Sequence, residues 1–475
     1  MRAWYRHPDA AEHRRPGGAW DGPTLDGLCT GTGVLDDGAV AATAGALAAR
    51  GVRRGGVVTW TARNRPADLT LLGACWRLGA VAAPRHHRAG TGETAAFLAA
   101  LRAAGARVTD LGEVRAAGPV PDGLGDAPPW RHPAARASDL AVALATGGST
   151  GVPKVVLHTQ RALSYKARTM AAFHGLGPGD AVLMPAPLAH MSGLLNGLLV
   201  PAAAGMRVVL MDRWDPEAAL ALIRARRVTF MVGPPTFFRQ LLDAPGFRTE
   251  HVAGLRLVSL GGAGVTPAFV EEAAARLGAV VKRSYGSTEA PTVTSWAPGD
   301  PPERAVHTDG RPVGPVRVRL ADDGELLVRG PELFAGYTDP AATVAAIERG
   351  WFRTGDLATI SDGWVTITGR KKAIVIRGGE NIAVAEVEDT LRAHPAVREA
   401  VVVGVPDPVM GERVGAVVLA DAPFDLATCR AWFAARGVAR YKTPERVLQV
   451  ERLPLLANGK PDRPALVRRL AAAPA

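Results

Sequence analysis

The chain is poor in cysteine and has no long hydrophobic run, and each absence removes a class of protein. Only three cysteines occur in 475 residues, and Cys29, Cys75 and Cys429 lie far apart. Their spacing fits neither a disulfide framework nor a metal site, so we expect thiols in a reducing compartment. The longest apolar stretch, residues 193–205, is interrupted by proline and glycine and is too short to span a bilayer. The first residues lack the apolar run of a signal peptide, so we expect a cytoplasmic protein.

Charge of one sign is in excess, but it is not gathered into a block. The chain has 56 lysine and arginine residues against 45 aspartate and glutamate residues, a net charge of +11. The arginines are scattered, and no stretch combines a basic block with interleaved aromatic residues, as nucleic-acid-binding proteins do. We therefore expect no nucleic-acid partner. A positive field of this kind would attract small anions such as nucleotides.

The length and the pattern of apolar residues predict at least two domains and an α/β fold. A chain of 475 residues exceeds the ~250–300 at which a single core stops growing. Residues 57–62 are typical of a strand and precede a helical pattern over 66–80. Another predicted strand, 255–262, precedes a helix over 266–279 that Thr266 can cap. Such alternation favours largely parallel sheets flanked by helices.

The pattern changes after residue 300. Short strands joined by a turn at 322–324 are predicted within residues 316–337, and they indicate a β-subdomain. We predict a large N-terminal domain over 1–369, with mixed and parallel sheets, and a small α+β domain over 370–475. Residues 81–137 are rich in glycine, proline, alanine and arginine, and we expect them to cross the surface between subdomains.

A glycine-rich stretch, ATGGSTGVPKVV at 145–156, is the first candidate for a binding site. It is not the common P-loop, because Pro153 precedes Lys154 and a β-branched pair follows, which discourages a helix. We therefore predict a loop between two strands. Its glycines can bring backbone N–H groups close to an anion, and its hydroxyl groups and lysine add donors. The alternative is an ordinary glycine-rich hairpin turn.

Three more stretches carry groups that bind nucleotides. SYGSTEAPT at 284–292 presents a tyrosine, hydroxyl groups and a carboxylate within a few residues. WFRTGDL at 351–357 ends a predicted strand with Asp356, and LPLLANGKPDR at 453–463 places Lys460 in a turn that contains glycine. Taken singly, an acid such as Asp356 is more often a solvated surface residue.

In this order and at this spacing, the four stretches and SLGGAG at 259–264 resemble the adenylate-forming superfamily of acyl- and aryl-CoA ligases. The resemblance covers about residues 35–470. It implies that ATP and Mg²⁺ are used to convert a carboxylic acid to an acyl-adenylate with release of pyrophosphate, and that the acyl group then passes to CoA. It also implies that the small C-terminal domain rotates about a hinge at Lys372, so that one site serves both half-reactions.

The resemblance assigns a role to each matching residue. The phosphate loop comprises Thr146, Gly147, Gly148, Ser149, Thr150, Gly151 and Lys154. The nucleotide-binding residues beyond that loop are Gly262, Ala263, Tyr285, Gly286, Asp356 and Arg370, of which Tyr285 packs on adenine and Asp356 and Arg370 hold the ribose. The catalytic residues are Lys460, Glu289, Thr288 and Lys154, of which Glu289 faces Mg²⁺ and Lys460 bridges the acid and the α-phosphate. The residues that line the acyl pocket are His190, Met191, Val232, Gly233 and Gly261.

The substrate and the acceptor are left open. We expect a small monocarboxylic acid that is aromatic, alicyclic or medium-chain, and Arg283 is the candidate cation for a second carboxylate. CoA is the preferred acceptor, since the sequence contains no fused carrier domain. The alternatives are a free-standing carrier protein and a nitrogen nucleophile in specialised, secondary metabolism. A binding-only pseudoenzyme is a further alternative, but Lys460, Glu289 and Asp356 are all present.

Overall fold

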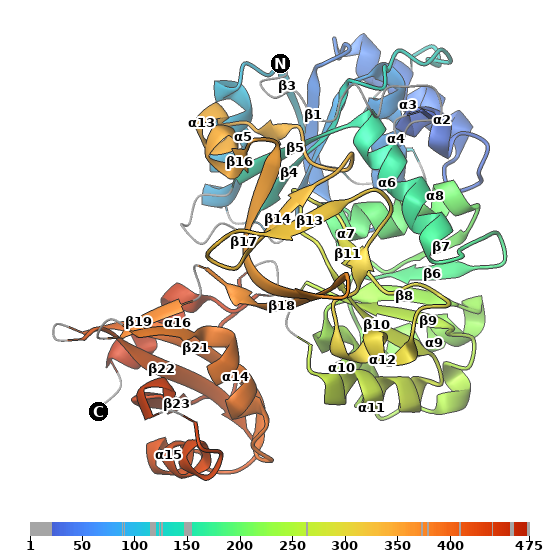
Figure 1. Ribbon diagram of the computed structural model, residues 1–475. Coiled ribbons are helices and arrows are strands. Elements are labelled where there is room, and N and C mark those ends of the chain that lie inside the picture. Colours follow the sequence, from blue (N-terminus) through green and yellow to red (C-terminus); the bar gives the residue numbers. More distant parts are fainter. Residues whose placement is uncertain are drawn as a thin grey trace. The chain divides into compact units, whose positions relative to one another are not determined.

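A computed structural model (Figure 1) shows the chain as two compact units. The first unit comprises Met1–Arg319, Leu327–Arg353 and Ser361–Val365, and the second comprises Leu320–Leu326, Thr354–Ile360 and Thr366–Ala475. The structure describes residues 21–87, 89, 91–114, 120–122, 124, 127–146, 154–262, 265–371, 374–377, 380–407, 410–438, 440–456 and 460–472. Within these ranges, every helix is too short or too polar to cross a lipid bilayer.

The first sheet of unit 1 is mostly parallel. In sheet order its strands are β15 (Gly336–Tyr337), β5 (Lys154–Thr159), β4 (Leu140–Thr146), β2 (Val81–His86), β1 (Val57–Ala62) and β3 (Val108–Glu113). β1 pairs in parallel with β2 and β3, and β2 pairs in parallel with β4. β5 runs antiparallel to both β4 and β15, so the chain reverses direction at the glycine-rich loop.

The second sheet of unit 1 is parallel through its centre. In sheet order its strands are β12 (Arg311–Pro312), β11 (Thr294–Ser295), β10 (Val280–Tyr285), β9 (Leu257–Leu260), β8 (Phe230–Gly233), β6 (Ala181–Met184) and β7 (Arg207–Leu210). The strands from β7 to β10 pair in parallel, whereas β11 and β12 are antiparallel additions at one edge. The carboxyl ends of neighbouring parallel strands meet at one edge, where α/β proteins bind ligands.

Helices cover both sheets of unit 1. They are α2 (Leu25–Cys29), α3 (Asp37–Ala49), α4 (Pro66–Leu78), α5 (Thr91–Ala103), α6 (Gln160–Phe173), α7 (Met191–Leu194), η1 (Leu195–Leu199), α8 (Val200–Ala204), α9 (Pro216–Arg226), α10 (Pro235–Leu242), η2 (Thr249–His251), α11 (Pro267–Leu277), α12 (Pro302–His307) and α13 (Pro340–Ala346). Proline opens α4, α9, α10, α11, α12 and α13. Proline suits a helix start because its fixed φ is helical and its missing N–H has no partner there. Thr266 caps α11 as the sequence predicts, accepting a hydrogen bond from the Phe269 N–H.

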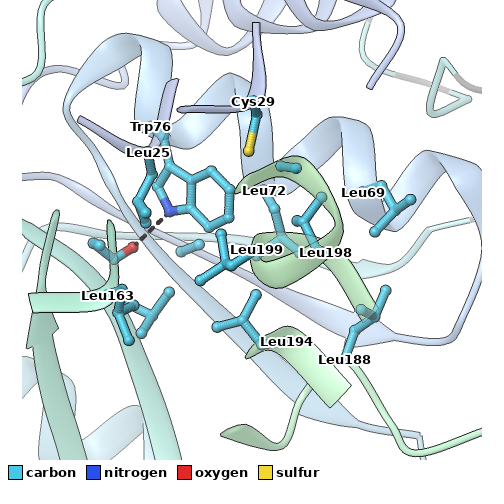
Figure 2. Packing of buried hydrophobic residues seen from close by; sticks show 14 of the residues in the cluster. Leu25, Cys29, Leu69, Leu72, Trp76, Leu163, Leu188, Leu194, Leu198 and Leu199 are labelled. Atoms are coloured by element: carbon cyan, nitrogen blue, oxygen red, sulfur yellow. Dashed lines mark hydrogen bonds between the residues drawn. The ribbon is translucent and has the colours of Figure 1, made fainter. Parts of the chain in front are cut away.

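The core follows from the alternation of side chains along the strands. Val57 of β1 packs with α5 on one face of the first sheet, and Val58 packs with α3 and α4 on the other face. Figure 2 shows part of this second cluster, in which leucines surround Trp76. The Trp76 indole N–H donates to the Ala141 carbonyl at 3.2 Å, so its one polar atom is satisfied. α9, α10 and α11 cover one face of the second sheet.

Five strands form a third sheet, through which the division between the units runs. They are β13 (Arg317–Leu320), β14 (Glu325–Arg329), β16 (Ile347–Glu348), β17 (Trp351–Ser361) and β18 (Trp364–Arg370). The expected turn joins β13 to β14, with Gly324 at φ +79°. Asp362 and Gly363 form the turn between β17 and β18, both with positive φ.

The rest of unit 2 is a small α+β structure. Its strands are β19 (Ile374–Arg377), β20 (Glu380–Ala383), β21 (Val397–Asp407), β22 (Gly411–Ala420) and β23 (Arg446–Gln449), and its helices are α14 (Val384–Arg392), α15 (Leu426–Ala435), η3 (Arg440–Lys442) and α16 (Arg463–Ala472). Along β21, Val402 faces the core beneath α14 and α15, and Val403 packs beside α16. The predicted fold class, a large α/β part with a β-subdomain and a small α+β part, is confirmed. The boundary between residues 369 and 370 stays a prediction.

One prediction about the fold is wrong. Residues 81–137 do not simply cross the surface, because Val81–His86 forms β2 in the middle of the first sheet and Val108–Glu113 forms β3. Alanine and proline at 82–84 have low strand propensity, which obscured β2 in the sequence. Small side chains nevertheless suit a strand that is buried between packed helices, and Ala82 and Ala83 are fully buried.

Candidate active site

The glycine-rich loop is anchored by two paired strands. Thr146 ends β4 and lies opposite Lys154, the first residue of β5, and the Thr146 hydroxyl donates to the Lys154 carbonyl at 3.3 Å. The structure therefore brings together the first and last residues of the predicted phosphate loop. Gly147, Gly148, Ser149, Thr150 and Gly151 lie outside the described residues.

The segment after β10 presents the second group of predicted residues. β10 ends at Tyr285, and the chain then turns back so that the Ser287 N–H donates to the Ala290 carbonyl at 3.0 Å. A Cβ atom on Gly286 would lie 2.3 Å from the Thr292 nitrogen, so only glycine fits at that position. The tight turn displays Thr288 and Glu289 just beyond the carboxyl edge of the parallel strands.

A histidine that sequence reasoning missed ties these two segments together. His158 of β5 is fully buried, and its Nε2 lies 2.6 Å from the Thr288 carbonyl oxygen, which is an acceptor. Burial lowers the pKa of His158 to about 4. The ring is thus neutral near pH 7, with its proton on Nε2. The only signal in the sequence is that His158 lies four positions after Lys154 in one strand, so that both side chains belong to the same face. This does not reveal a partner 130 residues away.

A tyrosine that the sequence did not single out connects two predicted catalytic residues. The Tyr337 hydroxyl donates to Glu289 Oε1 at 2.8 Å. The Lys154 ammonium lies 4.8 Å from the centroid of the Tyr337 ring, within the range of a cation–π contact. The Phe334 N–H also donates to the Glu289 carbonyl at 2.9 Å. Glu289 is therefore held at both its backbone and its side chain.

Three of the predicted glycines lie at the ends of β8 and β9. The Gly261 N–H donates to the Gly233 carbonyl at 3.1 Å, which brings these two positions together beside Val232. A Cβ atom on Gly233 would lie 2.9 Å from the Phe237 ring, so that ring occupies the space the glycine leaves. Gly262 has a φ of +80°, and a Cβ atom there would meet no other atom within 4 Å, so it faces open space. Ala263 lies outside the described residues.

The other two pocket residues come from the segment before α7. His190 precedes α7, and Met191 is its first, buried residue. The Asn64 side chain fixes this segment, because its amide donates to the Ala186 carbonyl at 2.9 Å and its oxygen accepts from the Leu188 N–H at 2.9 Å. The His190 ring centroid lies 5.1 Å from that of His86, at the end of β2.

A buried lysine lies behind the predicted nucleotide segment. Lys282 of β10 is fully buried, and its ammonium donates to the Ser295 hydroxyl and, at 3.3 Å, to the Ser259 hydroxyl. Ser259 in turn lies 3.0 Å from the Ser284 hydroxyl, next to Tyr285. Burial lowers the pKa of Lys282 to about 7. Hydroxyl groups rather than a carboxylate thus solvate this amine.

A second buried lysine lies in α6, and its charge interacts with that of a carboxylate in the segment that leads to Tyr337. Lys166 of α6 and Glu332 are both fully buried, and neither side chain makes a hydrogen bond to a described residue. Burial lowers the pKa of Lys166 to about 8, with the Glu332 charge opposing that shift. Burial likewise raises the pKa of Glu332, with Lys166 opposing it. Each charge depends on the other for compensation.

The candidate cation for a second substrate carboxylate already has a partner. Arg283 is buried and makes two hydrogen bonds to Asp309, at 3.1 Å from Nε and 2.8 Å from Nη2. A bidentate pair of this kind neutralises the guanidinium and fixes its direction. Arg283 is therefore a poor ligand for a substrate anion.

The predicted ribose-binding pair belongs to unit 2. Arg370 Nε donates to Asp356 Oδ1 at 2.6 Å, and Asp356 is only 4% exposed. The Asp356 N–H donates to the Thr354 hydroxyl at 3.0 Å, and the Gly355 N–H donates to Glu325 Oε1 at 2.9 Å. The structure brings Asp356 and Arg370 together as predicted. Their binding of ribose stays a prediction.

Lys460 also belongs to unit 2 and lies in a turn. Its carbonyl accepts from the Leu456 N–H at 2.8 Å, and Leu455 pairs with Pro461 across the turn. The residue is exposed at the surface of its unit. The predicted hinge, Lys372, lies outside the described residues.

The chemistry of unit 1 fits one divalent cation held mainly by a substrate. Within the described ranges, no three His, Cys, Asp or Glu side chains are grouped so that they could hold a metal ion. Glu289 offers a single carboxylate, and the Tyr337 side chain that binds it also contacts Lys154 at one end of the predicted phosphate loop. Mg²⁺ is commonly bound by one or two carboxylates together with substrate phosphates and water, so the donor set fits Mg²⁺ bound with a nucleotide.

Comparisons with known proteins agree on one family. The family model for "AMP-binding enzyme" matches residues 37–338, and the model for "AMP-binding enzyme C-terminal domain" matches residues 386–460. A feruloyl-CoA synthase from Amycolatopsis is 34% identical over 89% of this chain and 90% of its own length. A medium-chain fatty-acid–CoA ligase from Escherichia coli is 38% identical over 68% of this chain, and the match spans 60% of that ligase.

Solved structures give the same result. The ATP-bound MatB from Rhodopseudomonas palustris superposes with a TM-score of 0.82 at 29% identity, over 91% of this chain and 92% of that one. The o-succinylbenzoate CoA synthetase MenE from Bacillus subtilis, in complex with ATP and magnesium, gives 0.78 at 28% identity, over 90% and 92%. The amide bond synthetase McbA from Marinactinospora thermotolerans gives 0.76 at 30% identity, over 91% and 93%.

Proposed function

Because the chain belongs to the AMP-binding enzyme family, we propose that it activates a carboxylic acid with ATP and transfers the acyl group to CoA. In the first half-reaction a carboxylate oxygen attacks the α-phosphorus of ATP, the bond to the β-phosphate breaks, and pyrophosphate leaves. In the second, the CoA thiol gives up its proton and attacks the acyl carbon, and AMP leaves. ATP, Mg²⁺ and CoA are the cofactors that this reaction requires.

The observation that carries the proposal is the contact of one tyrosine with Lys154 and Glu289 beside the phosphate loop. Lys154 would offset negative charge on the β- and γ-phosphates, and Glu289 would hold Mg²⁺. When bound, Mg²⁺ would offset the charge that develops on the phosphate oxygens. Removing one group that stabilises such charge typically costs ~3–4 kcal/mol of barrier. The turn that His158 holds would present Thr288 to the α-phosphate.

The residues of unit 2 complete the proposed chemistry. Asp356 would accept hydrogen bonds from the ribose hydroxyl groups, with Arg370 fixing its carboxylate. Lys460 would bridge the substrate carboxylate and the α-phosphate in the first half-reaction only. Rotation about Lys372 would then remove it before the thiol arrives. The cytoplasmic location stays a prediction.

For the acid, we propose an aromatic, alicyclic or medium-chain monocarboxylic acid. The pairing of Arg283 with Asp309 supports a single carboxylate, because the cation that would have bound a second one is occupied. The names of the relatives, which refer to feruloyl-CoA and to medium-chain fatty acids, are compatible with this class.

A panel of acids tests the proposal. Pyrophosphate release is measured with ATP and Mg²⁺ for each acid, with and without CoA, and products are identified by mass spectrometry. We expect acid-dependent release and an acyl-CoA product for at least one member of the class. Release that does not depend on any acid, or no release with any of them, would contradict the proposal.

A nitrogen acceptor is the second candidate, and the similarity to the amide bond synthetase McbA favours it. The same assay distinguishes the acceptors when amines or a free-standing carrier protein replace CoA. An amide product formed faster than the thioester would identify an amine as the physiological acceptor. A loaded carrier in preference to acyl-CoA would identify a carrier-loading enzyme.

A further inference from the structure

Tyr337 lies on a two-residue strand that the predicted motifs do not include. β15 pairs antiparallel with β5 and places Tyr337 opposite Val156, two residues from Lys154. Hydrogen bonds from the Ala335 N–H to the Leu157 carbonyl (2.7 Å) and from the Thr338 N–H to the Val155 carbonyl (3.0 Å) fix the register. The side chain is 4% exposed. Its position is thus set by the strand that begins with the phosphate-loop lysine.

Phe334 holds the Tyr337 side chain, and Thr343 holds its backbone. The Phe334 ring meets the Tyr337 ring edge-on, with centroids 4.9 Å apart. The Tyr337 N–H donates to the Thr343 hydroxyl at 2.8 Å. A ring fixed in this way has little freedom to change its rotamer, so the direction of its hydroxyl group is determined by the fold.

The fixed ring separates two opposite charges. Its hydroxyl group binds Glu289 Oε1, and its face receives the Lys154 ammonium. Among the described ion pairs, none joins Lys154 directly to Glu289. A direct pair would turn both charges toward each other and away from a ligand, whereas a phenol between them leaves the second carboxylate oxygen and the ammonium protons available.

We propose that Tyr337 is a positioning residue that keeps Glu289 and Lys154 apart and aims them at the magnesium ion and the phosphates of ATP. This rests on the proposed function, since it takes Mg²⁺–ATP as the ligand. The hydroxyl group orients the carboxylate, and the ring orients the lysine. The two parts of one side chain therefore have separable effects.

Two substitutions separate these effects. Tyr337→Phe removes only the hydroxyl group, and we expect the half-saturating Mg²⁺ concentration for pyrophosphate release to rise about tenfold, with kcat at saturating Mg²⁺ close to that of the native chain. Tyr337→Leu also removes the ring, so Lys154 can pair with Glu289. We expect it to lower kcat of adenylation about tenfold as well. Both variants should retain acyl-CoA formation from a supplied acyl-adenylate.

A binding measurement without turnover gives an independent readout. Mn²⁺ replaces Mg²⁺ as the probe, and its binding in the presence of ATP and the absence of acid is followed by electron paramagnetic resonance. We expect weaker Mn²⁺ binding in Tyr337→Phe by about tenfold. Tyr165→Phe is the matched control, because it removes the hydroxyl group of another buried tyrosine, on α6. It should leave Mn²⁺ binding unchanged.

A double substitution keeps the test decisive if Tyr337→Leu does not fold. In a Glu289→Gln background, Tyr337→Phe should cause no further loss of Mn²⁺ binding, because the carboxylate is already absent. The inference would be overturned if folded Tyr337→Phe required the same Mg²⁺ concentration as the native chain and bound Mn²⁺ equally well. Absence of acid-dependent pyrophosphate release in the native chain would instead overturn the proposed function.

Discussion

The candidate site residues of the two units are held in different ways. In unit 1, contacts join distant parts of the chain, as between His158 and Thr288, 130 residues apart, and between Tyr337 and Glu289, 48 apart. In unit 2, Asp356 is held by Arg370, 14 residues away, and Lys460 by its own turn. The site residues of unit 1 that make these contacts are buried or half-buried and joined by hydrogen bonds between distant segments, whereas those of unit 2 have local contacts and are partly exposed. The two groups should respond differently to substitution. Changes near the first should alter stability, and changes in the second should alter activity alone.

The strongest test of the buried side is Lys166→Met. It removes the positive charge that favours the ionised form of buried Glu332, and leaving a buried charge uncompensated costs ~3–5 kcal/mol of unfolding free energy. Chemical denaturation at pH 7 measures this loss. The control is the double variant Lys166→Met with Glu332→Gln, which removes both charges and should recover most of the stability. If the single variant were as stable as the native chain, unit 1 would not depend on its buried charges.

Lys460→Ala provides the contrast in unit 2. Because Lys460 is exposed, we expect no change in the unfolding transition, and we expect adenylation to fall ~10²–10³-fold through loss of charge stabilisation. Pyrophosphate release measures the first half-reaction, and thioester formation from a supplied acyl-adenylate measures the second. The second should stay near the native rate. An equal loss in both assays would mean that Lys460 does not act in adenylation alone.

His158 makes the stability of unit 1 depend on pH. Its pKa is lowered to about 4 in the folded chain from an ordinary value near 6.5, so the unfolded chain binds more protons between these values. The free energy of unfolding should therefore fall as the pH is lowered from about 6.5 to 4, by up to ~3 kcal/mol from this group. Denaturation across this range measures the slope. His158→Gln keeps a donor toward Thr288 and should have a shallower slope; an unchanged slope would contradict the assignment.

The smallest expected effect is that of Asp356→Asn. The substitution preserves size and should leave the fold intact, but it weakens both the pairing with Arg370 and the proposed bonds to ribose. We expect KM for ATP to rise about tenfold, equivalent to ~1.4 kcal/mol, with a smaller change in kcat. Initial rates of pyrophosphate release at varied ATP concentration measure it. A rise in KM for the acid rather than for ATP would place Asp356 in another role.

The same difference between local and distant contacts explains what the sequence could predict. The family, the fold class, the capped helix at Thr266 and the pairing of Asp356 with Arg370 follow from short motifs, and the structure and comparisons confirm the first three as well as the contact of the fourth. The contacts of His158 and Tyr337 could not be inferred, because they depend on the antiparallel pairing of β5 with β4 and β15. The residues of a strand do not show which other strands will pair with it.

The mistaken interpretation of residues 81–137 has a related cause. A half-buried strand shows alternation, but β2 is buried on both faces and has alanine and proline at 82–84, so its sequence shows no alternation and little strand propensity. Burial of this kind becomes visible only when the helices on both sides are known.

The second unit is assembled from three separate stretches of the chain, Leu320–Leu326, Thr354–Ile360 and Thr366–Ala475. An N-terminal fragment that ends at the predicted boundary, residue 369, would therefore keep the first two stretches. It would lose nearly all of the third, which holds α14, α15 and α16. If residues 370–475 were exchanged for those of a relative, the relative's sequence would have to pack against Leu320–Leu326 and Thr354–Ile360 of this chain. Recombination between members of the family should succeed more often when all three stretches are exchanged together.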